Sequence, residues 1–234
     1  NQVQTSTTFK YVQQGTYYAY CHAWKRDENG KKVFSDWSNA YPWGVQLVFD
    51  NKVILGTRAR KTRTRSFNAF SSIDYPETAV FRDTRLVTFL RRPADQPPVR
   101  FYERLEPAVF VLRLVPGMRA DIIPLLVPHY RALVLESFGV GGLPGGEHGE
   151  MFAALRRWCE SGRLAVFTTQ VPHEGCDLAV YEVGRAVGEL PGVLEARDMT
   201  PEAVAVKLMW ALGQTDDREK AARLFETPIE YDIM

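Results

Sequence analysis

The sequence predicts an α/β protein with a small, doubly wound parallel sheet in its C-terminal part, preceded by segments rich in β-hairpins. Two observations predict this class. After residue 106, short apolar runs are each followed by a helical pattern, and such strand–helix repeats form right-handed parallel crossovers. Before that point, short Tyr-, Thr- and Val-rich strands alternate with turn signals, without a helical period.

The composition is that of an ordinary globular protein: 45% of the 234 residues are hydrophobic and 24% are charged. The net charge of +1 gives no bulk electrostatic reason to expect nucleic acid or an anionic membrane as a partner. No apolar run approaches the roughly 20 residues needed to span a bilayer, and residues 1–10 lack the apolar core of a signal peptide. We therefore expect no membrane association.

The three cysteines, Cys21, Cys159 and Cys176, are scattered and odd in number. They have no metal-ligand spacing and suggest no disulfide framework, which favours a reducing, cytoplasmic compartment. We expect each to be a free, buried thiol.

Two hairpins are predicted in the first part of the chain. Residues 15–24 and 31–40 alternate as half-buried strands do, and Asn29-Gly30 between them is a strong turn signal. Residues 44–56 contain two short apolar strands around Asp50-Asn51-Lys52. Residues 91–100 carry three prolines and are predicted to be a linker.

A basic run follows the second hairpin, with five cationic residues within eight positions. It could bind phosphate, but without interleaved aromatic residues it is interpreted as a solvated or interface loop, and nucleic acid is not expected. Its members are Arg58, Arg60, Lys61, Arg63 and Arg65.

The C-terminal part is predicted to contain three strands, at 108–116, 131–137 and 164–170, and five helices. The first helix opens at Asp121, with Pro124 confined to its first turn. The second spans 147–160 and the third lies near 178–187. A fourth begins at an N-capping Thr200 and ends at Gly213, and a fifth begins behind Thr215.

Ligands of such sheets bind outside the carboxyl ends of the strands, which here are residues 137–142 and 168–170. Within them, five glycines fall between positions 139 and 146. The alternative interpretation is a strand-to-helix turn with no role beyond structure. No catalytic residue and no metal ligand is predicted; the candidate site residues are Ser137, Gly139, Gly141, Gly142, Thr168, Thr169 and Gln170.

Two nucleotide-binding patterns are disfavoured. A dinucleotide fingerprint that begins at Gly139 would place Pro144 where the last glycine belongs, and no Gly-Lys-Ser/Thr loop occurs.

The four histidines, His22, His129, His148 and His173, have no Gly-x-Ser-x-Gly partner and no metal spacing. His173 stands closest to the predicted site edge.

Several motifs occur together between Trp43 and Phe225: GVQLVFDNKVILGTRARKTRTRSFNAFSS, VLRLVPGMRADII, ALVLESFGVGGLP, FTTQ and ARDMTPEAVAVKL. In their order and spacing they resemble the bacterial cytoplasmic (type I) L-asparaginases. The resemblance implies hydrolysis of L-asparagine to aspartate and ammonia through a threonine nucleophile and an acyl-enzyme, without metal or organic cofactor. It also implies homodimers, often paired into tetramers, in which the glycine turn lies close to a neighbouring subunit's substrate.

The sequence departs from the family pattern in two ways. The Thr-Gly-Gly-Thr-type nucleophile loop, and the later Thr-Asp motif with its lysine, do not occur here; Thr215-Asp216 is the only Thr-Asp pair and lies at a helix end. Many members have asparagine at the position of Gly142, and Glu136 stands where some cooperative members have a basic residue. Activity from this chain alone is therefore not expected.

Residues 1–42 resemble the closing strands of a fibronectin type III domain. The predicted organisation is this β-hairpin segment, a remnant of the asparaginase N-terminal domain plus linker over 43–106, and the asparaginase C-terminal α/β domain over 107–234. Two other hypotheses remain: a non-catalytic binding or assembly module, and the asparaginase-like subunit of a tRNA-dependent amidotransferase.

Overall fold

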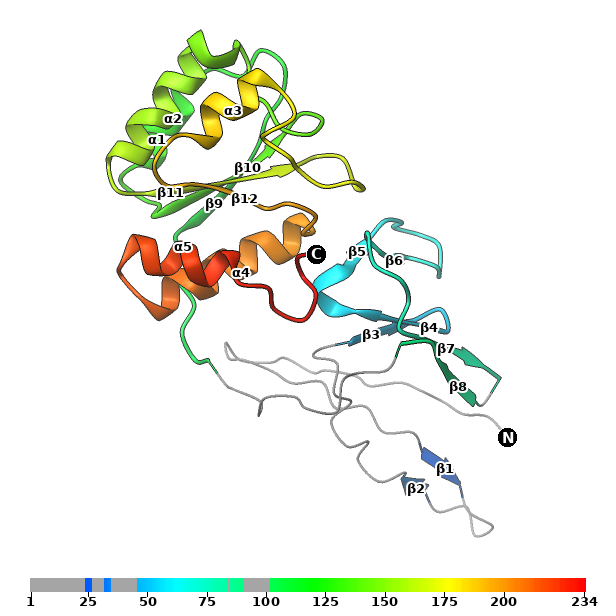
Figure 1. Cartoon of the computed structure of the whole chain (residues 1–234). Helices are drawn as coiled ribbons and strands as arrows, with labels where there is room; N and C mark the ends of the chain where they lie inside the picture. Colours follow the sequence, from blue (N-terminus) through cyan, green and yellow to red (C-terminus); the bar gives the residue numbers. More distant parts are fainter. Residues whose placement is uncertain (1–23, 27–31, 35–45, 84, 91–101) are drawn as a thin grey trace. The chain divides into compact units, whose positions relative to one another are not determined.

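The computed structural model describes residues 24–26, 32–34, 46–83, 85–90 and 102–234 (Figure 1). The chain divides into two compact units. One comprises residues up to 56, 61–70 and 76–103; the other comprises 57–60, 71–75 and 104–234. Within the described ranges, no helix is long and apolar enough to cross a membrane.

Two antiparallel sheets occupy the first unit. Strands β1 (Trp24–Arg26) and β2 (Lys32–Phe34) pair with Trp24 opposite Phe34, which confirms the strands of the first hairpin. Its turn at 27–31, the outer parts of both predicted strands and Cys21 lie outside the described residues. The second sheet has the order β3-β4-β7-β8; these strands span Gln46–Phe49, Lys52–Leu55, Ala79–Arg82 and Arg85–Thr88.

The second predicted hairpin, β3–β4, is confirmed. Phe49 pairs with Lys52, so the turn consists of Asp50 and Asn51 alone, whose φ angles are 51° and 61°. Two consecutive residues with positive φ suit the right-handed twist of the flanking strands, and Asp and Asn tolerate this conformation. A short 3-10 turn (Gly56–Arg58) then leads to β5 (Ala59–Lys61), which pairs with β6 (Phe70–Ser72).

The second unit contains the predicted parallel sheet, in the order β9-β10-β11-β12. The three predicted strands are β9 (Val109–Arg113), β10 (Ala132–Ser137) and β11 (Leu164–Thr169). The fourth, β12 (Val193–Glu195), was not predicted because three residues are too few to show a pattern. The α/β class is confirmed, although the strands follow one another in chain order, without a reversal.

Helices cover both faces of this sheet, as Figure 1 shows. Helices α1 (Ile122–Leu126), α2 (Glu150–Glu160) and α3 (Glu182–Gly188) connect the strands and lie on one face. A 3-10 turn over Gly146–His148 precedes α2. Helices α4 (Pro201–Gln214) and α5 (Arg218–Glu226) follow the last strand and lie on the other face.

Capping explains where the predicted helix limits were correct and where they were wrong. The Thr200 hydroxyl accepts a hydrogen bond from Ala203 N at 3.2 Å, so this N-cap is confirmed. The predicted start of α5 is wrong, because Asp217 is the N-cap and accepts from Lys220 N at 2.9 Å. Helix α3 begins later than predicted because the Asp177 carboxylate accepts from Ala179 N and holds that segment in a turn.

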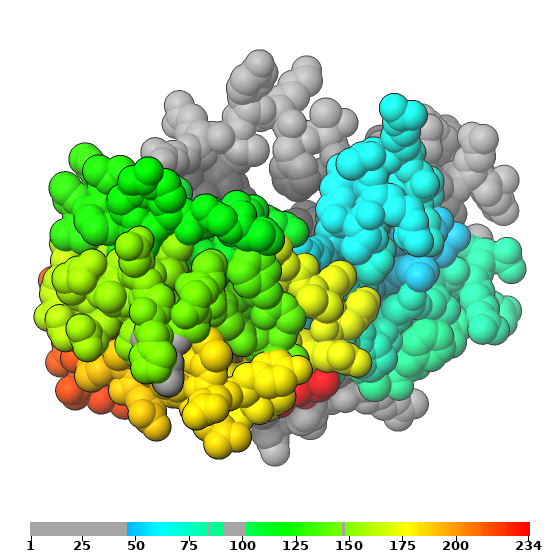
Figure 2. Space-filling view, turned by 90° about the horizontal axis from the view of Figure 1, so that it is seen from above, coloured from blue at the N-terminus to red at the C-terminus, as the bar shows by residue number. Residues whose placement is uncertain are grey.

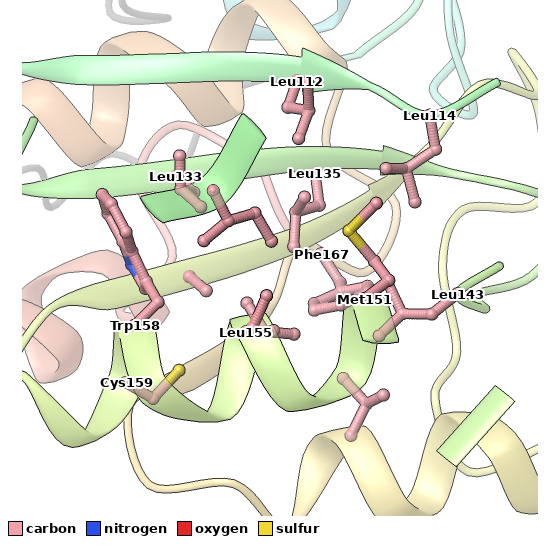
Figure 3. Close-up of a cluster of buried hydrophobic side chains, with 14 of the residues drawn as sticks. Leu112, Leu114, Leu133, Leu135, Leu143, Met151, Leu155, Trp158, Cys159 and Phe167 are labelled. Atoms are coloured by element: carbon pink, nitrogen blue, oxygen red, sulfur yellow. The ribbon is translucent and has the colours of Figure 1, made fainter. Parts of the chain in front are cut away.

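Alternating strand residues build a separate core on each face of the sheet. Leu133, Leu135 and Phe167 pack with Leu155 and Trp158 of α2 in the cluster of Figure 3. The intervening strand residues, such as Val134 and Val166, face the opposite side. There they pack with Leu208 of α4 and Phe225 of α5 in a second cluster. A sheet covered on both faces requires nearly continuous apolar strands, which explains the runs in the sequence.

The interpretation of the basic run as a solvated loop is wrong for its first member. Arg58 is fully buried. Its guanidinium donates to the Asp198 carboxylate at 2.8 Å, to the Asp198 carbonyl at 2.8 Å and to the Tyr231 carbonyl. Its partners lie 140 or more positions away in the sequence, where local composition gives no sign of them.

Replacing Asp198 by alanine is expected to destabilise the fold by about 3–5 kcal/mol, because it leaves the Arg58 charge buried without its counter-ion. Arg60→Gln is the matched control: Arg60 pairs at 3.6 Å with Glu202, whose side chain is 59% exposed, and its loss costs under about 1 kcal/mol. Urea unfolding of the three proteins measures both values. Equal, small losses in the two variants would contradict the assigned role of Arg58.

Candidate functional site

The carboxyl edge of the parallel sheet brings Ser137 and Thr169 together. These two residues are paired in the β10–β11 register, each as the last residue of its strand. Ser137 is buried, and its hydroxyl donates to the Thr168 carbonyl at 2.8 Å. Both side chains lie on the face covered by α1, α2 and α3, since they continue the alternation of Leu135 and Phe167.

The glycine turn is attached to this edge through Thr169. The Thr169 hydroxyl donates to the Gly139 carbonyl at 2.5 Å and accepts from Val171 N at 3.0 Å. The φ angles of Gly139 and Gly141 are 51° and 141°, which side chains other than glycine rarely adopt. One threonine hydroxyl thus fixes both the turn and the start of the next loop.

The two central glycines of the turn have different surroundings. A Cβ atom at Gly141 would lie 2.8 Å from Leu178 Cδ2 and 3.5 Å from the Cys176 sulfur, and a φ of 141° strains other residues, so this position favours glycine. A Cβ atom at Gly142 would meet nothing within 4 Å. Gly142 is therefore the position at which the turn can present a group to a ligand or to another chain.

Gln170 joins the ends of two strands. Its side-chain Nε2 donates to the Leu114 carbonyl at 2.6 Å and to the Glu136 carbonyl at 2.9 Å, and its backbone N–H donates to the Ser137 carbonyl at 3.1 Å. The Glu136 carbonyl also accepts from Leu114 N at 3.0 Å, so Gln170 adds a second donor to it. Gln170 therefore shapes the edge and has no side-chain donor left for a ligand.

The candidate residues do not form one constellation. Thr168 points to the face covered by α4 and α5, opposite to Ser137 and Thr169, because neighbouring strand residues alternate. Its buried hydroxyl has no hydrogen-bond partner within the described part of the chain. Glu136, its register partner, forms an ion pair with Arg113 at 3.4 Å. The sheet thus separates Thr168 from the glycine turn.

Sequence reasoning missed a polar cluster beside the turn, formed by Cys176, Asp177 and Glu195. The Asp177 backbone N–H donates to the Val140 carbonyl at 2.7 Å, which places this segment against the turn. Burial raises the pKa of Glu195, which accepts a backbone hydrogen bond from Leu178 and lies near Asp177 and Arg197. No motif joins residues 176 and 195; β12, too short to predict, brings Glu195 here.

Both described cysteines are free and buried, as predicted. Burial, reinforced by the Glu195 and Asp177 carboxylates, raises the pKa of Cys176 to about 12, against the effect of its hydrogen bond with Ser137. Burial likewise raises the pKa of Cys159 to about 11. Thiols with such pKa values hold almost no thiolate at neutral pH and are not nucleophiles.

His173 binds a carboxylate instead of activating a hydroxyl. Its Nδ1 lies 3.0 Å from Asp74 Oδ1, and the other Asp74 oxygen accepts from Glu174 N at 3.0 Å. Residues 171–174 are exposed, in the yellow region of Figure 2, whereas Cys176 and Leu178 of the same segment are buried. His173 therefore orients a surface loop next to the glycine turn.

The described residues of this edge can position a ligand but do not include an activated nucleophile. Among the described residues, Thr169 bonds to backbone groups, and Ser137 bonds to the Thr168 carbonyl and the Cys176 thiol. Neither hydroxyl pairs with a histidine or carboxylate base. The same residues contain no group of three His, Cys, Asp or Glu side chains that could hold a metal ion. The turn offers a rigid backbone and the open position Gly142.

This architecture defines a small α/β domain with a parallel sheet covered on both faces, and comparison with known proteins identifies its family. The family model of the glutaminase/asparaginase C-terminal domain matches residues 108–225, and that of the asparaginase N-terminal domain matches residues 34–94. The chain belongs to the asparaginase family.

Its relatives include two kinds of protein. An L-asparaginase of Thermococcus kodakarensis is 37% identical over 191 residues, which are 81% of this chain and 57% of the relative. The solved structure of the thermostable L-asparaginase of this organism superposes with a TM-score of 0.76 at 34% identity, over 82% of this chain and 57% of that one. A glutamyl-tRNA(Gln) amidotransferase subunit of Pyrococcus furiosus is 33% identical over 183 residues, 76% of this chain and 40% of the relative. The chain therefore spans about half the length of these relatives.

Alanine substitutions at Gly141 and Gly142 should differ in their effect on stability. Gly142→Ala is expected to change the free energy of unfolding by less than about 0.5 kcal/mol, since the new methyl group meets no atom. Gly141→Ala is expected to cost about 1–3 kcal/mol, because alanine is strained at a φ of 141° and contacts Leu178. Chemical unfolding of both variants measures this difference, and equal losses would contradict the geometry of the turn.

Proposed function

We propose that this chain is the C-terminal part of an asparaginase-type amidohydrolase that converts L-asparagine to aspartate and ammonia. The observation that carries the proposal is the state of the glycine turn: Thr169 and the Cys176–Leu178 segment hold it, while Gly142 remains open. A turn held in this way costs little to order when a ligand binds.

In the proposed reaction, a threonine hydroxyl attacks the side-chain amide carbon of asparagine and forms a tetrahedral intermediate. Collapse of the intermediate breaks the C–N bond, releases ammonia and leaves an acyl-enzyme ester, which water hydrolyses to aspartate. The threonine belongs to the family's Thr-Gly-Gly-Thr-type loop, which this sequence does not contain. The glycine turn contributes from the side, as a wall of a neighbouring subunit's site.

We further propose the finer assignments that the resemblance suggests. They are type I asparaginase character, a homodimer or homotetramer, a cytoplasmic location and catalysis without metal or cofactor. The proposed organisation is a fibronectin III-like hairpin segment over residues 1–42, a remnant of the N-terminal domain over 43–106 and the C-terminal domain over 107–234. The family matches at 34–94 and 108–225 support the last two segments.

A chimera tests the proposal. Residues 43–234 are joined behind the N-terminal part of the Thermococcus kodakarensis L-asparaginase, so that a nucleophile loop precedes the remainder of the domain. The chimera is expected to release ammonia from L-asparagine, whereas residues 1–234 alone release none. In the chimera, Gly142→Asn is expected to raise kcat/KM several-fold by adding a side chain where many family members have asparagine.

Two controls accompany this assay. Alanine in place of the nucleophile-loop threonine should abolish ammonia release by the chimera without loss of folding. A folded, dimeric chimera that does not turn over would contradict the enzyme assignment and favour the binding or assembly module. Ammonia release by residues 1–234 at the rate of the chimera would contradict the supporting role of the turn.

A second candidate function is that of an amidotransferase subunit that works on tRNA-bound substrate. Besides the relatives of that name, one observation favours it: Lys61, Arg63 and Arg65 are exposed, and Phe67 in the same loop is 73% exposed. The Phe67 ring stacks on Phe49 with 5.0 Å between centroids. Cations beside an exposed aromatic ring suit an RNA backbone and an unpaired base.

Titration of the chain with tRNA tests this candidate. If the loop binds RNA, the triple variant Lys61→Gln, Arg63→Gln, Arg65→Gln should weaken binding at least tenfold and flatten its dependence on salt concentration. Arg119→Gln is the control, because Arg119 is exposed and, in the part of the chain that the structure describes, its ion pair is with Asp121. Arg58 must be left intact, since it is part of the core. Equal affinity of the triple variant and the control would exclude the loop.

A further inference from the structure

A hollow at the opposite, amino-terminal edge of the parallel sheet is surrounded by three arginines. Arg131 immediately precedes β10, Arg163 immediately precedes β11 and Arg218 is the first residue of α5. The hollow has a volume of about 210 Å³, and Ser161 and Asp216 also line it. It lies at the other end of the strands from the glycine turn.

Arg163 is a fixed positive charge in this wall. Its three guanidinium nitrogens donate to the Tyr130 carbonyl at 3.0 Å, to the Ser161 hydroxyl at 2.7 Å and to the Val127 carbonyl at 2.8 Å. The guanidinium also lies over the Trp158 ring, 5.4 Å from its centroid. None of these neighbours is negatively charged, so the field of Arg163 is not neutralised by them.

Arg218 also lacks a carboxylate partner among the described residues. Its Nη1 donates to the Cys159 carbonyl at 3.3 Å, which orients the side chain and leaves donors of the guanidinium for another acceptor. The N-terminal end of α5 is already capped, because the Asp217 side chain accepts from Lys220 N. The attraction for a ligand therefore comes from the guanidinium and not from the helix end.

Arg131 forms ion pairs with two carboxylates. It is 3.1 Å from Glu106, which is largely covered, and 3.1 Å from Asp216, whose side chain is 96% exposed. A pair with so exposed a carboxylate is weak, because water and salt compete with it. A ligand with more than one negative oxygen can therefore displace Asp216 from Arg131.

We propose that this hollow binds a phosphate-class oxyanion between Arg131 and Arg218, with Arg163 as the third positive charge. Phosphate carries between one and two negative charges at neutral pH, and guanidinium groups bind its oxygens with paired hydrogen bonds. Three guanidinium groups from separate segments suit a tetrahedral anion better than a planar carboxylate. Binding at this hollow does not depend on the proposed amidohydrolase activity.

Calorimetric titration of residues 1–234 with inorganic phosphate, at constant ionic strength set with sodium chloride, tests the site. Arg218→Gln is expected to weaken phosphate binding at least tenfold, and Asp216→Asn to strengthen it by removing the competing carboxylate. Arg223→Gln, on the same helix, should bind like the unmodified chain, since Arg223 does not line the hollow and its ion pair within the described residues is with Glu219. Thermal unfolding confirms that each variant is folded.

Further arms of the titration distinguish the source of the anion. Tighter binding of ADP than of inorganic phosphate, lost in Arg218→Gln, would identify a nucleotide; tighter binding of phosphate would identify the free ion. Three results would overturn the proposal: no binding of phosphate beyond that of chloride, equal binding by the chain and Arg218→Gln, or binding of succinate as tight as that of phosphate.

Discussion

Burial of the parallel sheet on both faces is the constraint on which the rest of the C-terminal unit depends. Because helices pack against each face, alternate residues of β10 and β11 belong to two separate cores. The same alternation continues into the polar strand ends. It places the Ser137 and Thr169 side chains on the face covered by α1, α2 and α3, where the glycine turn lies. Glu136 and Thr168 lie on the opposite face. A site at this edge can therefore use only every second residue.

Polar side chains at this edge mainly form hydrogen bonds with backbone carbonyls. Ser137, Thr169 and Gln170 donate from their side chains to carbonyls of the strand ends and of the turn. Arg58 does the same for the segment at Asp198 and Tyr231. The result is an edge whose shape is set in advance. In the role proposed for the glycine turn, such rigidity would limit the entropy lost on binding.

Local patterns were sufficient to predict much of this fold. The apolar runs of β9 to β11, the Asp50-Asn51 turn and the Thr200 cap each depend on residues close together in the sequence. Features that depend on distant partners were not predictable. The burial of Arg58 needs Asp198, the crowding at Gly141 comes from Leu178, and Glu195 joins the turn through the short strand β12.

The candidate site was predictable in position but not in composition. The carboxyl ends of parallel strands meet at one edge, so residues 137–142 and 168–170 were expected there. Which of them face a ligand depends on strand alternation at the last residue and on contacts with 176–178. A structure of the chimera with aspartate bound is the most direct test of the role proposed for the turn. It should place Gly142 in van der Waals contact with the aspartate of a neighbouring subunit; a turn that touches no ligand in any subunit would contradict that role.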